Sequence, residues 1–367
     1  MSASAIIDLF RLGRGTAMKT GNNMKETDTR NYGVLVLGGE GQLGSAVGRS
    51  FLGSPFGTTL LGHKDCDITE ASSVNGAIET YNPDIVVNCA ALTNVERIET
   101  DPEYRKIAYE TNVIGPWNIA RAVALHPDTI FVHISTDYIW SESWIRSTPP
   151  IPFPLNVYGH QKLEAELAIE TEINQHFDPV HGSRLAIIRP SWMWGGRDDD
   201  FVWRIIQNCY ICKAEGGEMK IPTDTGGYPV NCDILANSIK SLCQSWVLGV
   251  SRDPWKFCAY GTERMLSRYE WTKLIIGVWN EVSGTVGLMS FVPGEGSQNL
   301  TVGCVRHPAS VMQPSDDVPN ICGQTVDTMN VIAQLETYIR ANLDRMLDKI
   351  ELELRRKDLF DKLGGKL

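Results

Sequence analysis

The sequence lacks several features that define other classes of protein. It has no apolar run of the roughly 20 residues that a membrane-spanning helix needs, so we expect no membrane association. It has no excess of positive charge, because 44 acidic residues outnumber 34 basic ones and leave a net charge of −10. This balance argues against nucleic acid as the main partner. With 43% hydrophobic and 21% charged residues, the composition is that of a globular chain.

Cysteine is present but forms no framework that the spacing would reveal. The nine cysteines are odd in number and follow no secretory signal, so we expect reduced thiols and a cytoplasmic protein. Cys209 and Cys212 form a CxxC, yet no second ligand pair has a similar spacing, and no zinc site is predicted. We interpret the pair as two thiols on neighbouring turns of a helix.

The order of patterns along the chain predicts an α/β fold. Residues 1–30 are polar and are expected to form a flexible N-terminal extension. Across 31–190, short β-rich runs alternate with helical patterns, with Thr69 as the predicted N-cap of one helix. This alternation is typical of a Rossmann-type, doubly wound parallel sheet that binds NAD(P). The looser pattern of 191–330 predicts a smaller C-terminal substrate lobe, interleaved with the last elements of the sheet.

A long charged helix with an apolar stripe is predicted over 327–362. Apolar residues recur there at helical spacing, from Ile332 through Ile339 to Ile350. We interpret it as a helix packed on its own domain. A contact in a homodimer is the alternative.

A glycine pattern stands at the first strand–helix junction. Gly38, Gly41 and Gly44 form a GxxGxxG directly after the β-rich run Val34–Leu37. The first glycine permits a tight turn, the second lets the backbone approach a pyrophosphate, and the third allows close packing of helix on strand. The following helix N-terminus offers free N–H groups to phosphates. The loop therefore predicts a dinucleotide site, with a plain tight turn as the alternative.

The residues after the second predicted strand bear on which dinucleotide binds. NAD enzymes usually carry an acid there, which binds the ribose 2′-hydroxyl. This chain has Gly62, His63 and Lys64 instead, and two cations could meet a 2′-phosphate. NADPH is therefore the predicted cofactor. Asp65 leaves NADH open, and His63 and Lys64 could equally be solvated loop residues.

A tyrosine and a lysine have the spacing of an acid–base pair. Tyr158 and Lys162 form a YxxxK, which places both side chains on one helix face. A nearby ammonium would lower the pKa of the tyrosine, which could then protonate a carbonyl oxygen while hydride reaches its carbon. Thr136, just past the fourth predicted strand, would hold that oxygen. An amphipathic helix with a surface lysine is the alternative.

Together these motifs resemble the extended short-chain dehydrogenases, and within them the dTDP-4-dehydrorhamnose reductases. The resemblance covers roughly residues 33–240. It rests on seven segments: Gly38–Gly44, Asp67–Thr69, Asn88–Glu99, Asn112 with Gly115 and Pro116, Ser135–Tyr138, Pro154–Lys162 and Arg189–Trp192.

The resemblance implies NADPH-dependent reduction of the 4-keto group of a nucleotide-linked deoxysugar, with Tyr158 as proton donor. The implied catalytic residues are Thr136, Tyr158 and Lys162. Besides His63 and Lys64, the implied cofactor-binding residues are Gly38, Gly41, Gln42, Leu43, Gly44, Asp67, Ile68, Ala90, Ala91, Asn112, Tyr158 and Lys162. The residues implied to border the sugar nucleotide are Thr93, Val95, Tyr138 and Trp192.

The chain also departs from the family pattern. The substrate-lobe motif is altered over Asp224–Val230, and in Ser141–Phe153 the one acidic residue, Glu142, does not stand where the family pattern expects it. Ala46 replaces a glutamate with which some members bridge two subunits through a metal, so no metal is expected. The β subunit of methionine adenosyltransferase is similar to these reductases, and Tyr269-Glu270 resembles it. A non-catalytic, NADP-binding regulatory subunit is therefore the alternative function.

Overall fold

The structure is a computed structural model. The predicted extension over 1–30 and most of Ser141–Phe153 lie outside the residues it describes. The described ranges are 32–140, 152–176, 184–247, 255–285, 291–294 and 328–363.

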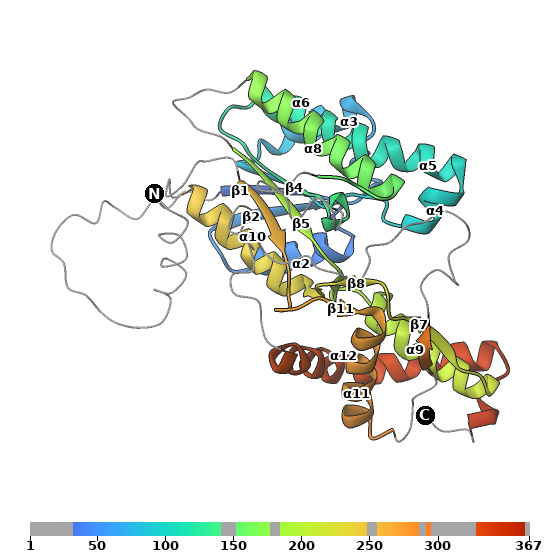
Figure 1. The fold of residues 1–367 in the computed structure, drawn as a ribbon. Helices are drawn as coiled ribbons and strands as arrows, with labels where there is room; N and C mark the ends of the chain where they lie inside the picture. Colours follow the sequence, from blue (N-terminus) through green and yellow to red (C-terminus); the bar gives the residue numbers. More distant parts are fainter. Residues whose placement is uncertain are drawn as a thin grey trace.

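Six parallel strands form the central sheet (Figure 1). They are β1 (Tyr32–Leu37), β2 (Phe56–Leu61), β3 (Ile85–Asn88), β4 (Ile130–Ile134), β5 (Leu185–Pro190) and β10 (Trp255–Ala259). Their order is β2-β1-β3-β4-β5-β10, so the winding reverses between β1 and β3. Ligands of doubly wound sheets bind at such a switch point, beyond the carboxyl ends of the strands. The predicted Rossmann-type sheet is confirmed.

Helices cover both faces of this sheet, because the strands are apolar on both sides. Val34 and Val36 face α2 (Gln42–Phe51) and α10 (Cys232–Val247), and all of them share one buried cluster. Leu35 and Leu37 point the other way. They lie in a second cluster with residues of three helices, α3 (Ala71–Tyr81), α6 (Gly115–Ala124) and α8 (Val157–Gln175).

Short elements precede α6 in the connection from β3 to β4, and one more follows β4 in the part of the next connection that the structure describes. They are α4 (Val95–Thr100), α5 (Pro102–Tyr109), the π-helical turn η1 (Glu110–Ile114) and the 3-10 turn η2 (Asp137–Ile139). The helix expected after the second strand begins differently from the prediction. Glu70, not Thr69, is the N-cap of α3, because the Thr69 hydroxyl donates to Asp67 Oδ1 at 2.8 Å.

A separate hydrophobic cluster lies beneath the sheet in Figure 1. It joins α9 (Phe201–Glu215), α11 (Arg268–Ser283) and α12 (Thr328–Arg356). The small strands nearby are β6 (Met193–Trp194), β7 (Met219–Pro222), β8 (Gly226–Gly227), β9 (Val230–Asn231), β11 (Leu266–Ser267) and β12 (Phe291–Gly294), and η4 (Asp361–Leu363) follows α12.

The apolar stripe of α12 is buried within this cluster, which confirms the interpretation of a helix packed on its own chain. Cys209 and Cys212 both lie on α9 as free cysteines, as interpreted. The division into 31–190 and 191–330 stays a prediction. None of the helices in the described ranges is long and apolar enough to cross a membrane.

Candidate active site

The glycine loop lies at the switch point and has the conformation of a phosphate-binding turn. Gly38 has φ +73°, and a Cβ added to it would lie 2.6 Å from the Ala90 backbone nitrogen. An added Cβ at Gly44 would collide with the Gly38 carbonyl, so the third glycine permits close helix–strand packing. Gly41 is the N-cap of α2, and among the described residues no side chain caps that helix end. Its first-turn N–H groups therefore suit an anionic ligand.

The two residues between these glycines have side chains that point elsewhere. Gln42 Nε2 donates to the Gly195 carbonyl at 2.8 Å and so ties the loop to the turn after β6. Leu43 is buried against the core between α2 and α10. Only their backbone N–H groups are placed to serve the predicted cofactor role.

The end of β2 carries an acid that the sequence analysis missed. His63 is 81% exposed, with Nδ1 3.8 Å from Asp67 Oδ1, and Lys64 is also exposed. Glu40 lies in the glycine loop, yet its side chain covers Gly62: a Cβ added to Gly62 would lie 2.5 Å from the Glu40 carboxyl carbon. The Glu40 carboxylate therefore lies at the end of β2, although Glu40 precedes Gly62 by 22 residues in the sequence.

The other predicted cofactor residues line the same edge of the sheet. Ala90 and Ala91 directly follow β3 and are half-buried. Asn112 is fully buried and holds Leu92, the residue after Ala91. Its amide accepts from Leu92 N and donates to Leu92 O, both at 2.9 Å. Asp67 and Ile68 follow β2, with Ile68 buried against Gly115. Asn112 therefore acts on the loop backbone in this structure.

Helix α8 places Tyr158 near the carboxyl end of β4. Asn156 caps this helix by accepting from Gly159 N at 2.8 Å. Only glycine fits at position 159, because an added Cβ would collide with the Tyr138 carbonyl. This approach brings the Tyr138 and Tyr158 rings edge to face, with centroids 6.0 Å apart. Thr136, which caps η2, interacts with the Tyr158 hydroxyl from the end of β4.

The electrostatics of Tyr158 differ from the expectation. Burial raises the pKa of Tyr158 well above its usual value, and the hydrogen bond with Thr136 opposes this only in part. The predicted lowering of the tyrosine pKa by Lys162 is therefore wrong for this arrangement. The reason is that the Lys162 side chain turns toward β4, where Nζ donates to the Ile134 carbonyl at 2.8 Å.

Lys162 is fully buried, which the alternative of a surface lysine does not allow. Burial lowers the pKa of Lys162 to about 8, while Glu166 and Cys89 act in the opposite direction. Glu166 lies one helical turn further along α8 and forms a bidentate pair with Arg189, at 3.0 and 2.6 Å.

The structure brings together only some of the predicted substrate residues. Val95 and Tyr138 pack with Tyr158 in one small cluster, and Thr93 is exposed just before α4. Trp192 is half-buried and belongs to a different group. The guanidinium of Arg268, at the start of α11, lies 3.6 Å from its ring centroid. The sequence analysis named the adjacent Tyr269-Glu270 but gave Arg268 no role, because its contact with Trp192 joins residues 76 positions apart.

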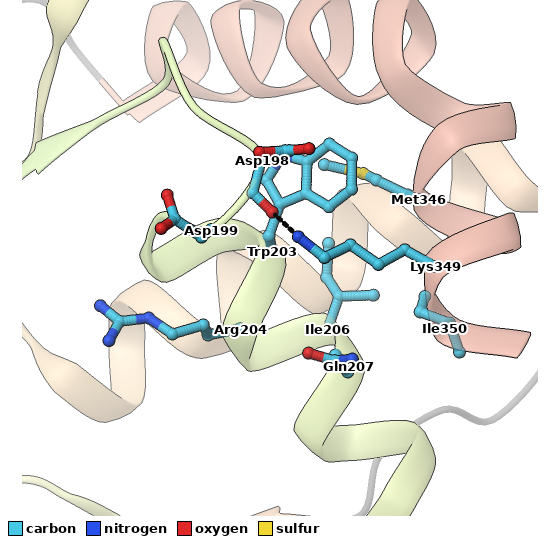
Figure 2. Close-up of a pocket in the computed structure, with 9 residues that line it drawn as sticks. All are labelled: Asp198, Asp199, Trp203, Arg204, Ile206, Gln207, Met346, Lys349 and Ile350. Carbon is cyan, nitrogen blue, oxygen red and sulfur yellow. Dashed lines mark hydrogen bonds between the residues drawn. The ribbon is translucent and has the colours of Figure 1, made fainter. Parts of the chain in front are cut away.

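A hollow between α9 and α12 is not part of this site. Figure 2 shows Lys349 of α12 reaching across it to the Asp198 carbonyl, with the Trp203 ring beside it. The Nζ–O distance is 2.6 Å, and the cavity is only about 60 Å³. The contact between Lys349 and the Asp198 carbonyl joins α12 to the segment just before α9. No group of three or more metal-ligating side chains occurs anywhere in the described ranges.

Comparisons with known proteins show what this chain is similar to. Residues 32–315 match the family described as "RmlD substrate binding domain". A dTDP-4-dehydrorhamnose reductase of Mycolicibacterium smegmatis is 30% identical over 63% of this chain and 67% of its own length. A probable dTDP-4,6-dihydroxy-2-methyloxan-3-one 4-ketoreductase of Streptomyces antibioticus is 29% identical over 56% of this chain. Only 65% of that relative's length is matched.

The solved structures bear on the fold. The dTDP-4-dehydrorhamnose reductase of Bacillus anthracis, in complex with NADP, superposes with a TM-score of 0.64. It is 23% identical, and the match covers 87% of this chain and 99% of that one. Because the family match spans most of the described sheet, glycine loop and α8, the chain belongs to the RmlD substrate binding domain family.

Proposed function

We propose that this chain is an NADPH-dependent oxidoreductase that reduces the 4-keto group of a nucleotide-linked deoxysugar. The observation that carries the proposal is the place of Tyr158 beside Thr136 at the carboxyl end of β4, where Lys162, one turn further along α8, donates to the Ile134 carbonyl. The glycine loop with its uncapped α2 lies at the neighbouring switch point. Its relatives' names support the same reaction class.

The residues divide the reaction as follows. NADPH, when bound, supplies a hydride to the carbonyl carbon. Tyr158 donates its hydroxyl proton to the carbonyl oxygen, so that the ketone becomes a hydroxyl, and Thr136 holds that oxygen by a hydrogen bond. Lys162 in its ammonium form stabilises the tyrosinate that remains. The left-handed turn at Gly38 and the free helix end at Gly41 fit the cofactor's pyrophosphate.

The regulatory alternative makes a different prediction. A reductase oxidises NADPH only after a 4-keto sugar nucleotide is added, which absorbance at the nicotinamide band measures directly. A regulatory subunit shows no turnover and instead captures a methionine adenosyltransferase catalytic subunit. We expect turnover with dTDP-4-keto-6-deoxy sugars. Capture without turnover across several keto-sugar nucleotides would overturn the proposal.

Glu40 is expected to weaken the preference for NADPH. Its carboxylate covers Gly62, near the position where a ribose 2′-substituent is recognised in this fold, and it repels a 2′-phosphate. Glu40→Gln should therefore tighten NADPH binding about 5- to 10-fold, which is roughly 1 kcal/mol, and leave NADH binding nearly unchanged. Calorimetric titration of both cofactors measures this ratio. Glu79→Gln, an exposed change on α3, is the matched control, and a ratio that moves equally in both variants would contradict the prediction.

A further inference from the structure

A chain of hydrogen-bonding contacts through three buried side chains connects the loop after β3 to Lys162. Asn88 ends β3, His133 lies on the neighbouring strand β4, and Lys162 lies on α8, and all three side chains are fully buried. Ala90 N donates to Asn88 Oδ1 at 3.0 Å, and Asn88 Nδ2 lies 3.3 Å from His133 Nδ1. The other ring nitrogen, His133 Nε2, lies 3.3 Å from Lys162 Nζ.

The direction of these contacts follows from the first of them. A backbone N–H can only donate, so the Asn88 atom that faces Ala90 is the amide oxygen. The amide nitrogen, which has only donor hydrogens, must then face His133 Nδ1. Nδ1 must accept, so the imidazole is neutral and carries its proton on Nε2. That proton points at Lys162 Nζ, which can accept it only as a neutral amine.

We propose that His133 is a positioning residue for Lys162: held by Asn88 as the Nε2–H tautomer, it presents a donor to Nζ and favours the neutral amine of this lysine in the free protein. The inference rests on the role of Lys162 in the proposed function. Lys162 can assist Tyr158 only as the ammonium. To become charged, its Nζ must take up a proton although the His133 Nε2–H donor faces it. The surroundings of the histidine agree, since burial alone lowers the pKa of His133 and so favours the neutral imidazole.

Other groups also face Lys162 and bear on its charge. Cys89, next to Asn88, has its pKa raised by burial and stays a neutral thiol. Glu166 favours the ammonium, but its carboxylate is held by Arg189. The Ile134 carbonyl accepts from Nζ in either charge state. Of these groups, His133 is the one that presents a donor to the lysine nitrogen.

The tautomer can be tested on the free protein without any reaction. Long-range ¹H–¹⁵N spectra of histidine-labelled protein distinguish protonated from unprotonated ring nitrogens, and His133→Gln assigns its signal among the seven histidines. We expect a neutral His133 with its proton on Nε2 between pH 6 and pH 8. A proton on Nδ1, or an imidazolium at pH 7, would overturn the proposal.

The effect on Lys162 is tested by reversing the direction of the chain. Asn88→Asp keeps an acceptor for Ala90 N but accepts from His133 Nδ1–H, so Nε2 becomes an acceptor and favours the ammonium. The new carboxylate also raises the lysine pKa through its charge, so the ¹H–¹⁵N spectrum of this variant must in addition show the ring proton moved to Nδ1. The midpoint of the Lys162 ¹³Cε titration should rise by at least one pH unit, and the fall of kcat/KM at high pH should move with it. Thr129→Val, which deletes a buried hydrogen bond to the Pro83 carbonyl, is the control.

The two readouts separate the possible failures. An unshifted lysine midpoint in Asn88→Asp, or an equal shift in Thr129→Val, would overturn the role of His133. Absence of turnover in the unmodified protein would instead overturn the proposed function, while the titration in the free protein would still report on His133 and Lys162.

Discussion

Replacing Tyr158 by Phe is expected to lower kcat about 10²- to 10⁴-fold, the usual contribution of a general acid. The change deletes only the hydroxyl, so the edge-to-face contact with Tyr138 is retained. Folding and NADPH affinity should therefore be almost unchanged. Steady-state kinetics, melting curves and calorimetric titration of NADPH measure the three quantities.

Two neighbouring changes show whether Tyr158 acts as part of a unit. Lys162→Met should lose both rate and cofactor affinity, and combined with Tyr158→Phe it should cost less than the product of the single effects. Thr136→Val should be milder, because it removes one hydrogen bond and leaves the acid in place. A folded Tyr158→Phe protein with near-normal kcat would remove Tyr158 from the chemistry.

Among the substitutions proposed for this chain, removing one partner of the Glu166–Arg189 pair should produce the largest loss of stability. The two side chains are 1% and 2% exposed, and both guanidinium–carboxylate contacts are short. Glu166→Leu leaves the arginine charge buried beneath Trp140, whose ring centroid is 5.0 Å away. We expect the free energy of unfolding to fall by about 3–5 kcal/mol, as measured by urea denaturation.

The double replacement distinguishes loss of the pair from loss of packing. Glu166→Leu with Arg189→Met removes both charges and keeps apolar volume, so most of the stability should return. Glu336→Ala breaks the exposed pair with Arg340 on α12 and should change stability by less than about 1 kcal/mol. A double variant as unstable as Glu166→Leu would show that the unpaired charge of Arg189 does not cause the loss of stability.

Local patterns in the sequence were sufficient for the architecture. The apolar runs and the helices between them predicted the parallel sheet, because strands buried on both faces must be apolar on both sides. The spacing of Gly38, Gly41 and Gly44 predicted a turn whose close approaches the structure shows. The helical spacing from Ile332 to Ile350 likewise predicted the buried stripe of α12. The assignment of roles to site residues, however, stays a prediction.

The long-range neighbours of the site could not be predicted in this way. Glu40 was passed over because its segment reads as a glycine loop, while its carboxylate reaches the end of β2. The expected lowering of the Tyr158 pKa was wrong because spacing on a helix fixes which face a lysine shares, not where its flexible side chain ends.

The sequence by itself determined the alternation of strands and helices over 31–190, the parallel sheet and the place of the glycine loop, because residues close together in the chain set each of them. It did not fix every boundary, since the N-cap of α3 is Glu70 rather than Thr69. Only the tertiary structure decided which buried groups meet. Asn88, His133 and Lys162 lie 45 and 29 residues apart along the chain, and they are neighbours because β3, β4 and α8 pack together. Where water is excluded, each donor must face an acceptor, and the proposed tautomer of His133 follows from that requirement.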